Sequence, residues 1–466
     1  MGVKKLIEYK KITIICLITI FLISSLTTGF SKDITIDNST SIQETIINSD
    51  MNDVIILESG IYTEFKIVVD KNLTITGGDF PENVIIDGKR SGVIFTVKNT
   101  SATVKFINIT FINGYNLQFG GAIENKAARL YIDNCVFINN TASNNGGALD
   151  NAGNNSYRGY LFVNNSVFIN NYAWHDGGAI TTLYGTTDIY NSYFTQNYAY
   201  RDGGAIRGGI YSVTNIFFSI FDNNTAKEWG GAIYFHPGSG QIRNSTISNN
   251  YAGDYGGGFL IDGAVTVTGS IIANNSAGAM GGAVFVGEEH PSLPSDAIFN
   301  YNLFYGNDAP EGSAIYISQT SSTKINFEYN DWNDDDPNDV IDCNPNYNRD
   351  KFIPTHEYKY PKPKINDPII DTAPGPIIIP NSTGPSPENP LTGLLNNNSG
   401  ITLALTISNF INEILNGNIG DSVKEAFSLT VTDSEGKVSI NGYVIGFIVL
   451  IVIAAIVIMG YRRLKN

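Results

Sequence analysis

The stretch FINNYAWHDGGAI, residues 168–180, decides the fold, because variants of it recur through the middle of the chain. The variants follow the pattern F-x-x-N-x-A-x-x-x-G-G-A-I, in which phenylalanine or isoleucine precedes a glycine pair by nine residues, or by eight in the last copy. These pairings are Phe111/Gly120, Phe137/Gly146, Phe168/Gly177, Phe194/Gly203, Phe221/Gly230, Ile247/Gly256, Ile272/Gly281 and Phe304/Gly312. A fixed period of tens of residues is typical of a solenoid, in which each repeat completes the core of its neighbours.

Each coil contains short extended runs, as at residues 120–123, 129–134 and 135–140, bounded by Asn, Gly or Lys. Short apolar runs between turn residues are typical of strands. One unit is too short to bury a core alone. We therefore predict an all-β fold, a parallel β-helix with three strands per turn, in which each strand pairs with its equivalent about 4.8 Å away.

Two columns of side chains follow from this stacking. The recurring phenylalanines are predicted to stack inside the coil, where aromatic rings bury much apolar area. An asparagine column is predicted to bond along itself, since an amide both donates and accepts, and asparagine also tolerates the left-handed backbone of a bend. Its members are Asn140, Asn171, Asn197, Asn224, Asn250, Asn275 and Asn307. The glycine pairs permit a sharp turn. The motif thus has structural reasons throughout and does not indicate catalysis.

The length of the coil varies almost wholly between a glycine pair and the next phenylalanine. The two longest insertions in this arc lie at about residues 151–160 and 287–296. Insertions collected on one face of a solenoid are often its binding face. We therefore expect this edge to contact a partner. Its candidate residues are Tyr157, Arg158, Glu288, Glu289 and His290.

The combination of F-x-x-N with G-G-A-I, over about residues 106–315, resembles the repeat of the polymorphic outer-membrane proteins, a family of bacterial surface adhesins. With an N-terminal signal-like segment at residues 1–30, a Pro-rich segment from residue 345 and an apolar C-terminal span at residues 443–461, the whole chain more closely resembles the adhesin-like surface proteins of methanogenic archaea. Residues 33–113 resemble the opening of pectin-lyase-like domains. These resemblances imply a right-handed, pectin-lyase-like β-helix over residues 33–344 and a role in adhesion.

The ends of the chain carry targeting signals. Residues 1–30 combine four lysines with an apolar run and predict a secretory signal peptide, with an uncleaved anchor as the alternative. Residues 345–442 are rich in Pro and Asn and predict an extended spacer. Residues 443–461 predict a transmembrane helix, and the basic stub 462–466 predicts a cytoplasmic C-terminus with the rest of the chain outside the plasma membrane.

The charge of the chain narrows the classes of molecule that it could bind. The formal net charge of −15 argues against nucleic acid as a partner, because nucleic acid needs a basic face.

Cys135 and Cys343 lie about eight coils apart, too far for a disulfide. Asn-x-Ser/Thr sequences, for example at Asn38, Asn99 and Asn381, are glycosylation acceptors in an exported chain.

One turn holds the candidate site chemistry. His175-Asp176 should stack against Arg201-Asp202, and the two carboxylates, about 5 Å apart, could share a cation. Both aspartates, however, occupy a turn where solvated polar residues are expected, so we predict no catalytic residue, metal or cofactor. The same turn carries aromatic residues that suit sugar rings, although a packing ladder is the alternative. These residues are Trp174, Tyr200, Trp229 and Tyr255.

Two functions fit this sequence. The first is a non-catalytic, membrane-anchored adhesin that contacts other cells, glycans or the envelope through an unknown surface glycan or protein. The alternative is a membrane-tethered polysaccharide lyase or glycosidase, because the fold hosts such enzymes and their sites use clustered acids. We favour the first, since the sequence holds no acid-rich strand motif.

Overall fold

The computed structural model describes residues 31–287, 296–318, 325–333, 335–357 and 359, and two short strands at 431–432 and 438–439. The predicted signal peptide, the transmembrane helix and most of the spacer lie outside the described residues. Within these ranges no helix has the length and apolar character needed to span a bilayer. The chain divides into two compact units, residues 1–380 and 381–466. In the second unit, β41 (Val431–Thr432) and β42 (Val438–Ser439) pair antiparallel.

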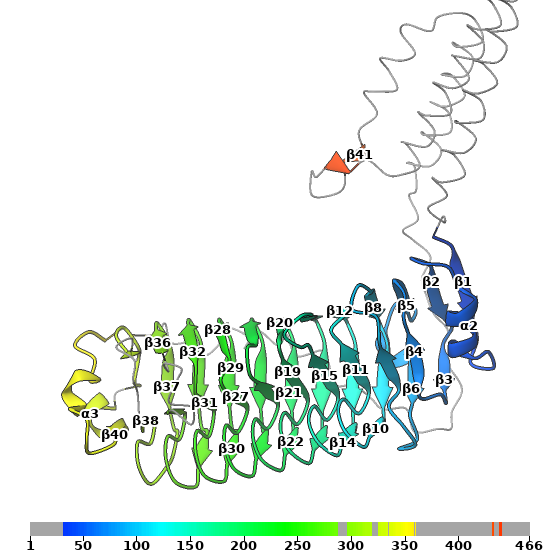
Figure 1. Cartoon of the computed structure of the whole chain (residues 1–466). Coiled ribbons are helices and arrows are strands. Elements are labelled where there is room, and N and C mark those ends of the chain that lie inside the picture. Colours follow the sequence, from blue (N-terminus) through cyan, green and yellow to red (C-terminus); the bar gives the residue numbers. More distant parts are fainter. Residues whose placement is uncertain are drawn as a thin grey trace, which may run out of the picture. The chain divides into compact units, whose positions relative to one another are not determined.

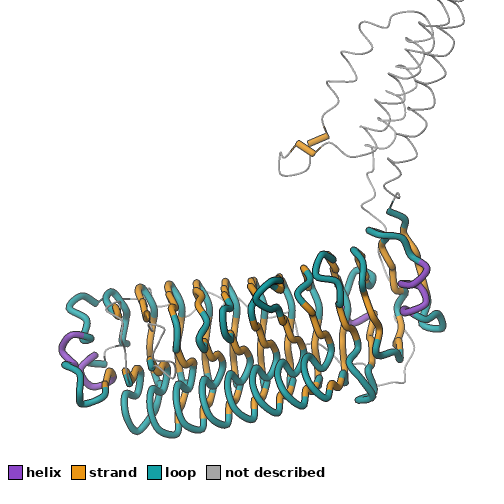
Figure 2. Tube along the Cα trace, viewed as in Figure 1, coloured by secondary structure: helices purple, strands orange, loops and turns teal. Residues whose placement is uncertain are grey.

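The first unit contains a parallel β-helix, in which equivalent strands of successive coils form four sheets (Figures 1 and 2). Sheet A comprises β1 (Asp33–Ile36), β2 (Val54–Leu57), β5 (Leu73–Thr76), β8 (Thr103–Ile107), β12 (Arg129–Asp133), β16 (Gly159–Asn164), β20 (Gly185–Tyr190), β24 (Val213–Phe217), β28 (Ser239–Arg243), β32 (Ala264–Thr268), β36 (Asp296–Asn300) and β39 (Ile325–Asn326). Sheet B comprises β3 (Gly60–Tyr62), β6 (Val84–Asp87), β9 (Thr110–Ile112), β13 (Val136–Ile138), β17 (Val167–Ile169), β21 (Tyr193–Thr195), β25 (Ile220–Asp222), β29 (Thr246–Ser248), β33 (Ile271–Ala273) and β37 (Leu303–Tyr305).

The remaining two sheets complete each coil. Sheet C comprises β4 (Ile67–Val69), β7 (Phe95–Val97), β11 (Ile123–Lys126), β15 (Leu149–Ala152), β19 (Ile180–Leu183), β23 (Ile206–Gly208), β27 (Ile233–Phe235), β31 (Phe259–Ile261), β35 (Val284–Val286), β38 (Ile315–Ile317) and β40 (Ile341–Cys343). Sheet D comprises two-residue strands: β10 (Tyr115–Asn116), β14 (Thr141–Ala142), β18 (Tyr172–Ala173), β22 (Tyr198–Ala199), β26 (Thr225–Ala226), β30 (Tyr251–Ala252) and β34 (Ser276–Ala277).

The predicted parallel β-helix is confirmed, but three strands per turn is wrong for the central coils, which add the short strand of sheet D. The run predicted at residues 120–123 is also mostly a turn. Gly120 has a φ of 64°, and β11 begins only at Ile123. The reason is that a left-handed glycine turns the chain between sheets D and C and cannot belong to a strand.

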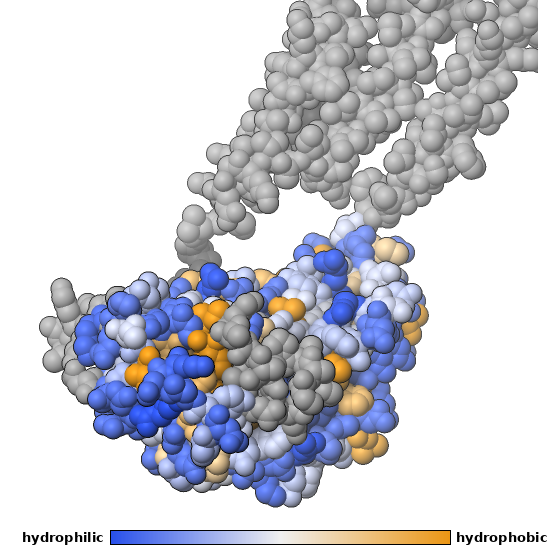
Figure 3. All heavy atoms as spheres, turned by 60° about the vertical axis from the view of Figure 1, so that its left-hand side comes forward, coloured by the Kyte–Doolittle hydropathy of each residue, from blue (hydrophilic) through white to orange (hydrophobic). Residues whose placement is uncertain are grey.

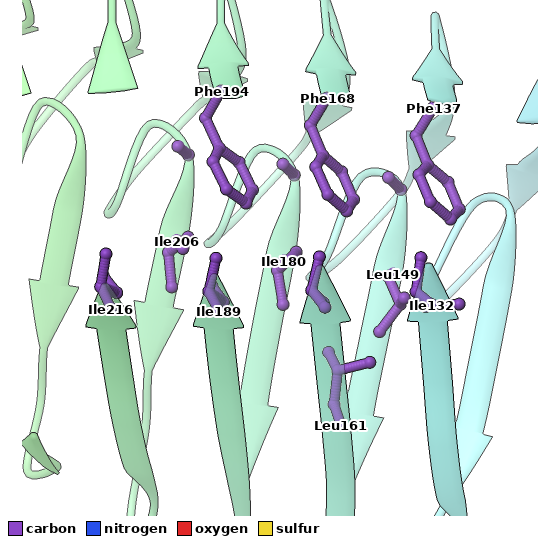
Figure 4. Packing of buried hydrophobic residues seen from close by; sticks show 14 of the residues in the cluster. Ile132, Phe137, Leu149, Leu161, Phe168, Ile180, Ile189, Phe194, Ile206 and Ile216 are labelled. Atoms are coloured by element: carbon purple, nitrogen blue, oxygen red, sulfur yellow. The ribbon is translucent and has the colours of Figure 1, made fainter. Parts of the chain in front are cut away.

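The phenylalanine column is confirmed. Phe111, Phe137, Phe168, Phe194 and Phe221 are fully buried, and their ring centroids follow one another at 4.6–4.8 Å with interplanar angles of 2–14°. Figure 4 shows three of these rings pointing the same way in successive coils, toward aliphatic side chains of sheets A and C. The stack lies in the core that runs through every coil of the β-helix.

The asparagine column is confirmed too, with one correction. The side-chain amide of each member donates to the Oδ1 of the next, at 2.9–3.0 Å from Asn140 to Asn307. The left-handed residue is, however, not the column member but its predecessor, as at Asn139, Asn170 and Gln196. The column asparagines are therefore selected for their amides, while the bend is made one residue earlier.

A serine column went unpredicted. It lies two residues before the phenylalanine, at Ser166, Ser192, Ser219, Ser245 and Ser270. Each backbone N–H donates to the Oγ of the next serine at 3.1–3.2 Å for the first four members. Cys135 begins the same column and donates its N–H to Ser166. Cys135 and Cys343 are both free, as predicted, and the structure buries both of them.

Short helices close the two ends of the β-helix (Figure 1). At the N-terminal end, α2 (Ile42–Asn48) buries Ile42 and Ile46, and η1 (Pro81–Asn83) lies two coils on, between β5 and β6. At the other end lie α3 (Pro337–Val340) and η2 (Arg349–Lys351). Trp332 ends the aromatic column by stacking on Phe304 at 4.8 Å. Seen from this end, the described surface is mostly hydrophilic with small apolar patches (Figure 3).

Candidate ligand-binding site

Trp174 and Tyr200 occupy the same place in successive coils, three residues before the glycine pair and just after the strands β18 and β22. Their ring centroids lie 5.8 Å apart, and the residues are 50% and 38% exposed. Lys227 holds the same place in the following coil. Its Nζ lies 4.1 Å from the Tyr200 ring centroid and donates to the Tyr200 hydroxyl at 2.8 Å. These three side chains form a ridge along the β-helix, here called the aromatic ridge.

Trp229 and Tyr255, the other two predicted aromatic residues, do not join this ridge. They lie directly before the glycine pair, two positions later in the turn, and their centroids are 6.2 Å apart. Both are half-buried and pack against a cluster on the outer face of sheet C that includes Phe285 and Tyr316. The structure therefore brings Trp174 and Tyr200 together as an exposed pair and assigns Trp229 and Tyr255 to packing.

Two open grooves flank the aromatic ridge. The charged groove, of about 660 Å³, is lined by Tyr115, Ser143, Trp174, His175, Tyr200, Arg201 and Glu228. The amide groove, of about 570 Å³, is lined by Asn170, Tyr172, Trp174, Gln196, Asn197, Tyr198, Tyr200, Asn223 and Thr225. In the charged groove Arg201 Nε lies 3.6 Å from Glu228 Oε2, so its opposite charges are paired. The amide groove presents only amides, hydroxyls and rings.

The aspartates of the turn are buried, which corrects the prediction that they are solvated. Asp176 and Asp202 are 5% and 3% exposed. The turn folds onto the outer face of sheet C, where Arg207 Nε lies 3.3 Å from Asp176 Oδ2, and Asp150 is also buried. Burial, followed by the charge of Asp176, raises the pKa of Asp202 to about 8. Burial, followed by Glu124, raises the pKa of Asp150 well above its usual value.

These carboxyl groups are poorly placed for chemistry on a polymer. One oxygen each of Asp150, Asp176 and Asp202 is buried and lacks a hydrogen-bond partner. Across the ranges that the structure describes, no group of three or more His, Cys, Asp or Glu is arranged to hold a metal ion. Asp150 and Asp202 can hold protons, because burial raises the pKa of each and favours the neutral carboxyl.

The edge formed by the two long insertions, at about residues 151–160 and 287–296, is here called the loop edge, and the structure describes only part of it. Tyr157 is 55% exposed, and the guanidinium of Arg158 lies 6.0 Å from the Tyr211 ring centroid and donates to the Tyr211 carbonyl. Glu288, Glu289 and His290 lie outside the described residues. Both insertions connect sheet C to sheet A, from β15 to β16 and from β35 to β36, so they leave the same corner of the coil, as expected.

One aromatic array was missed by sequence reasoning. On the outer face of sheet A, Tyr131, Phe162, Tyr190 and Phe217 form a chain with centroid separations of 4.7–5.9 Å. They are half-buried and cover one another. The sequence signal that could have revealed this array is the alternation of side chains along the strands of sheet A. In β16, for example, half-buried Tyr160 and Phe162 alternate with buried Leu161 and Val163.

A comparison with protein families agrees with the repeat. The model of the Chlamydia polymorphic membrane protein repeat matches residues 134–152 and 218–236, each of which carries one F-x-x-N and one glycine pair. The predicted resemblance is thereby confirmed at the level of the repeat. No curated protein sequence matches the chain.

Similar solved structures include three polysaccharide lyases. The family PL6 alginate lyase AlyGC is 10% identical with a TM-score of 0.35, over 67% of this chain and 49% of the lyase. Pectate lyase Pel9A is 15% identical with a TM-score of 0.37, over 65% and 81%. A PL6 polysaccharide lyase from Pseudopedobacter saltans is 12% identical with a TM-score of 0.29, over 62% and 87%. The chain thus spans about half the length of AlyGC, and these likenesses concern the fold alone.

Proposed function

We propose that this chain is a non-catalytic, adhesin-like surface protein whose β-helix contacts other cells, glycans or the envelope through the aromatic ridge. The observation that carries the proposal is the exposed pair Trp174 and Tyr200 with an open groove on either side. The match to a membrane-protein repeat supports a place at the cell surface. The predicted signal peptide and C-terminal helix would export and anchor the chain.

The pair suits binding for a physical reason. A large ring gains free energy from burial, yet Trp174 leaves half of its surface in water. Exposed apolar surface rimmed by polar groups marks interaction sites. Trp174 is also held in place, by Tyr172 at 5.3 Å and by Tyr200 at 5.8 Å. A ligand therefore meets a ring that is already ordered, which reduces the entropy lost on binding.

The buried aspartates favour a non-catalytic role over the lyase or glycosidase alternative. General acid–base chemistry needs groups within hydrogen-bond reach of the substrate. Asp176 and Asp202, the acids that the sequence brings nearest to each other, point away from solvent beneath the turn. A polysaccharide in either groove would meet aromatic rings before it met a carboxyl group of this pair.

The proposal is tested with cells that display the full chain. Replacing both Trp174 and Tyr200 by Ala should abolish attachment to partner cells or glycan-coated surfaces. The matched control replaces Tyr301 and Tyr329, an exposed stacked pair at 5.7 Å outside both grooves, by Ala. A third variant lacks residues 154–158 of the competing loop edge. Attachment that survives loss of the ridge but not loss of the loop would assign binding to the loop instead.

A further inference from the structure

The tyrosine stack in the amide groove ends at a threonine on each side. Tyr172 and Tyr198 stack at 5.2 Å with an interplanar angle of 9°. Along sheet D the same position is held by Thr141 before the pair and by Thr225 after it. The inner ring faces therefore cover each other. The outer face of Tyr198 looks over the small side chain of Thr225.

The neighbouring ring, that of Tyr200, has no face that is open to a ligand. Tyr200 has Trp174 on one side and the Nζ of Lys227, 4.1 Å from its centroid, on the other. Tyr198 and Thr225 both line the amide groove, whereas Thr141 lines neither groove. The ring face open to a ligand inside the amide groove is thus that of Tyr198.

The polar groups around this face are neutral. Gln196 and Asn223 are exposed, at left-handed positions with φ of 56° each, and flank Tyr198 from successive coils. Within the described part of the chain the Gln196 amide makes no hydrogen bond, and the Asn223 amide nitrogen donates to Asp222 at 3.0 Å. No Lys, Arg, Asp, Glu or His lines this groove. The chain as a whole has a net charge of −15, which repels anionic polymers.

We infer that the amide groove binds an uncharged oligosaccharide along the β-helix axis, with one sugar ring on the open face of Tyr198 and its hydroxyl groups bonded to Gln196 and Asn223. The inference rests on the proposed function and specifies the ligand class. An apolar sugar face matches the ring, and hydroxyl groups match amides that both donate and accept. The groove is lined by three successive coils, so its length follows the axis.

The deciding variant is Thr225→Tyr, which covers the open face of Tyr198 and keeps Tyr198, Gln196 and Asn223 in place. Tyrosine already occupies this column at Tyr251 in the next coil, so the stack should continue without disturbing the fold. The matched control is Thr141→Tyr, which extends the same stack at its other end, outside the groove. Both changes remove the threonine of an Asn-x-Thr sequence, at Asn223 and at Asn139.

The full chain, purified in detergent, is titrated with neutral gluco-, manno-, galacto- and N-acetylglucosamine hexasaccharides and with hexagalacturonate. At least one neutral sugar should bind, and Thr225→Tyr should weaken it by about tenfold or more, as expected for a lost stacking contact. Thr141→Tyr should bind like the wild type. Gln196→Ala changes an exposed amide that makes no hydrogen bond to any described residue, so it should weaken binding several-fold and leave the fold intact.

Three outcomes would overturn the inference: binding of hexagalacturonate alone, binding of no neutral hexasaccharide, or unchanged affinity in Thr225→Tyr. The proposed function is tested separately by the double alanine variant of the ridge. If that variant loses attachment while Thr225→Tyr attaches and binds as the wild type does, the adhesin proposal stands and the ligand assignment falls.

Discussion

The Oδ1 atom of Asn171 accepts two hydrogen bonds from Asn140, one from its backbone N–H at 3.1 Å and one from its side-chain amide at 3.0 Å. The Asn171 amide in turn donates to the Phe137 carbonyl at 3.1 Å and to Asn197 at 2.9 Å. Each asparagine thus satisfies backbone groups at a corner of the coil that water cannot reach. This column closes the corner between sheets B and D.

Replacing Asn197 by Ala should therefore destabilise the β-helix strongly. The change leaves the buried N–H of Asn171 and one hydrogen of its amide without an acceptor, and removes the Asn197 amide from the carbonyl of Phe168. We expect a loss of more than about 3 kcal/mol, since each orphaned buried group costs about 1–3 kcal/mol. Denaturant unfolding measures it. Asn307→Ala, at the half-buried end of the column, is the control, and an equal loss there would contradict a cooperative ladder.

The phenylalanine column predicts that two substitutions of Phe194 lower the free energy of unfolding by different amounts. Phe194→Ala should cost about 3–5 kcal/mol, because the cavity would lie between two stacked rings 4.6 Å away on either side. Phe194→Ile should cost less than about 1.5 kcal/mol, because Ile247 and Ile272 fill the same column in later coils. Matching unfolding midpoints for the two variants would show that the column is not closely packed.

Stability should fall as pH rises, because of Asp202. Its pKa is about 8 in the folded chain, above the ordinary value of 3.8. Between these values the folded state binds more protons than the unfolded state, so unfolding becomes easier by up to about 1.4 kcal/mol per pH unit. Asp202→Asn should therefore stabilise the chain at pH 8 and have little such effect at pH 4.

Thermal melts from pH 4 to pH 9 test this prediction. The control is Asp254→Asn, which alters an exposed aspartate in a turn two coils later. If the melting temperature of Asp202→Asn falls with pH as steeply as that of the wild type, proton binding at Asp202 does not set the pH dependence.

The second glycine of each pair is required by close approach of the backbone. A Cβ on Gly178 would lie 2.0 Å from the carbonyl oxygen of Gly204 in the next coil. Gly178→Ala should cost more than about 4 kcal/mol or prevent folding, since two backbone segments would have to separate. A Cβ on Gly78 meets no atom within 4 Å, so Gly78→Ala should fold normally. Soluble yield and circular dichroism of both variants give the answer.

The sequence predicted those features that repeat in every coil. The β-helix and the phenylalanine and asparagine columns follow from the recurrence of one residue type at one place. The short strand of sheet D was missed because two residues, such as Thr141 and Ala142, are too few to show alternation. The serine column was missed because its earliest members are not serine: Cys135 precedes Ser166.

The candidate site was predicted less well, because its geometry depends on one or two positions within a single turn. Trp174 and Trp229 both precede a glycine pair, by three residues and by one. The first side chain faces solvent, and the second folds onto sheet C. Asp176 shares the place of Trp229 and is buried for the same reason. Which way a turn position faces is decided by packing against another sheet, which periodicity does not report.

Because successive coils have the same kinds of corner, recombination can change the number of coils in such a chain. Deleting one whole unit, for example residues 225–250, would place Asn275 next to Asn224 and Ile272 next to Phe221, the same kinds of neighbours that each has now. The caps at α2 and α3 would be untouched. Gain or loss of a repeat therefore lengthens or shortens the molecule by about 4.8 Å at a time. The length of the β-helix can thus evolve in steps of one coil, while neighbouring coils keep the same kinds of contact.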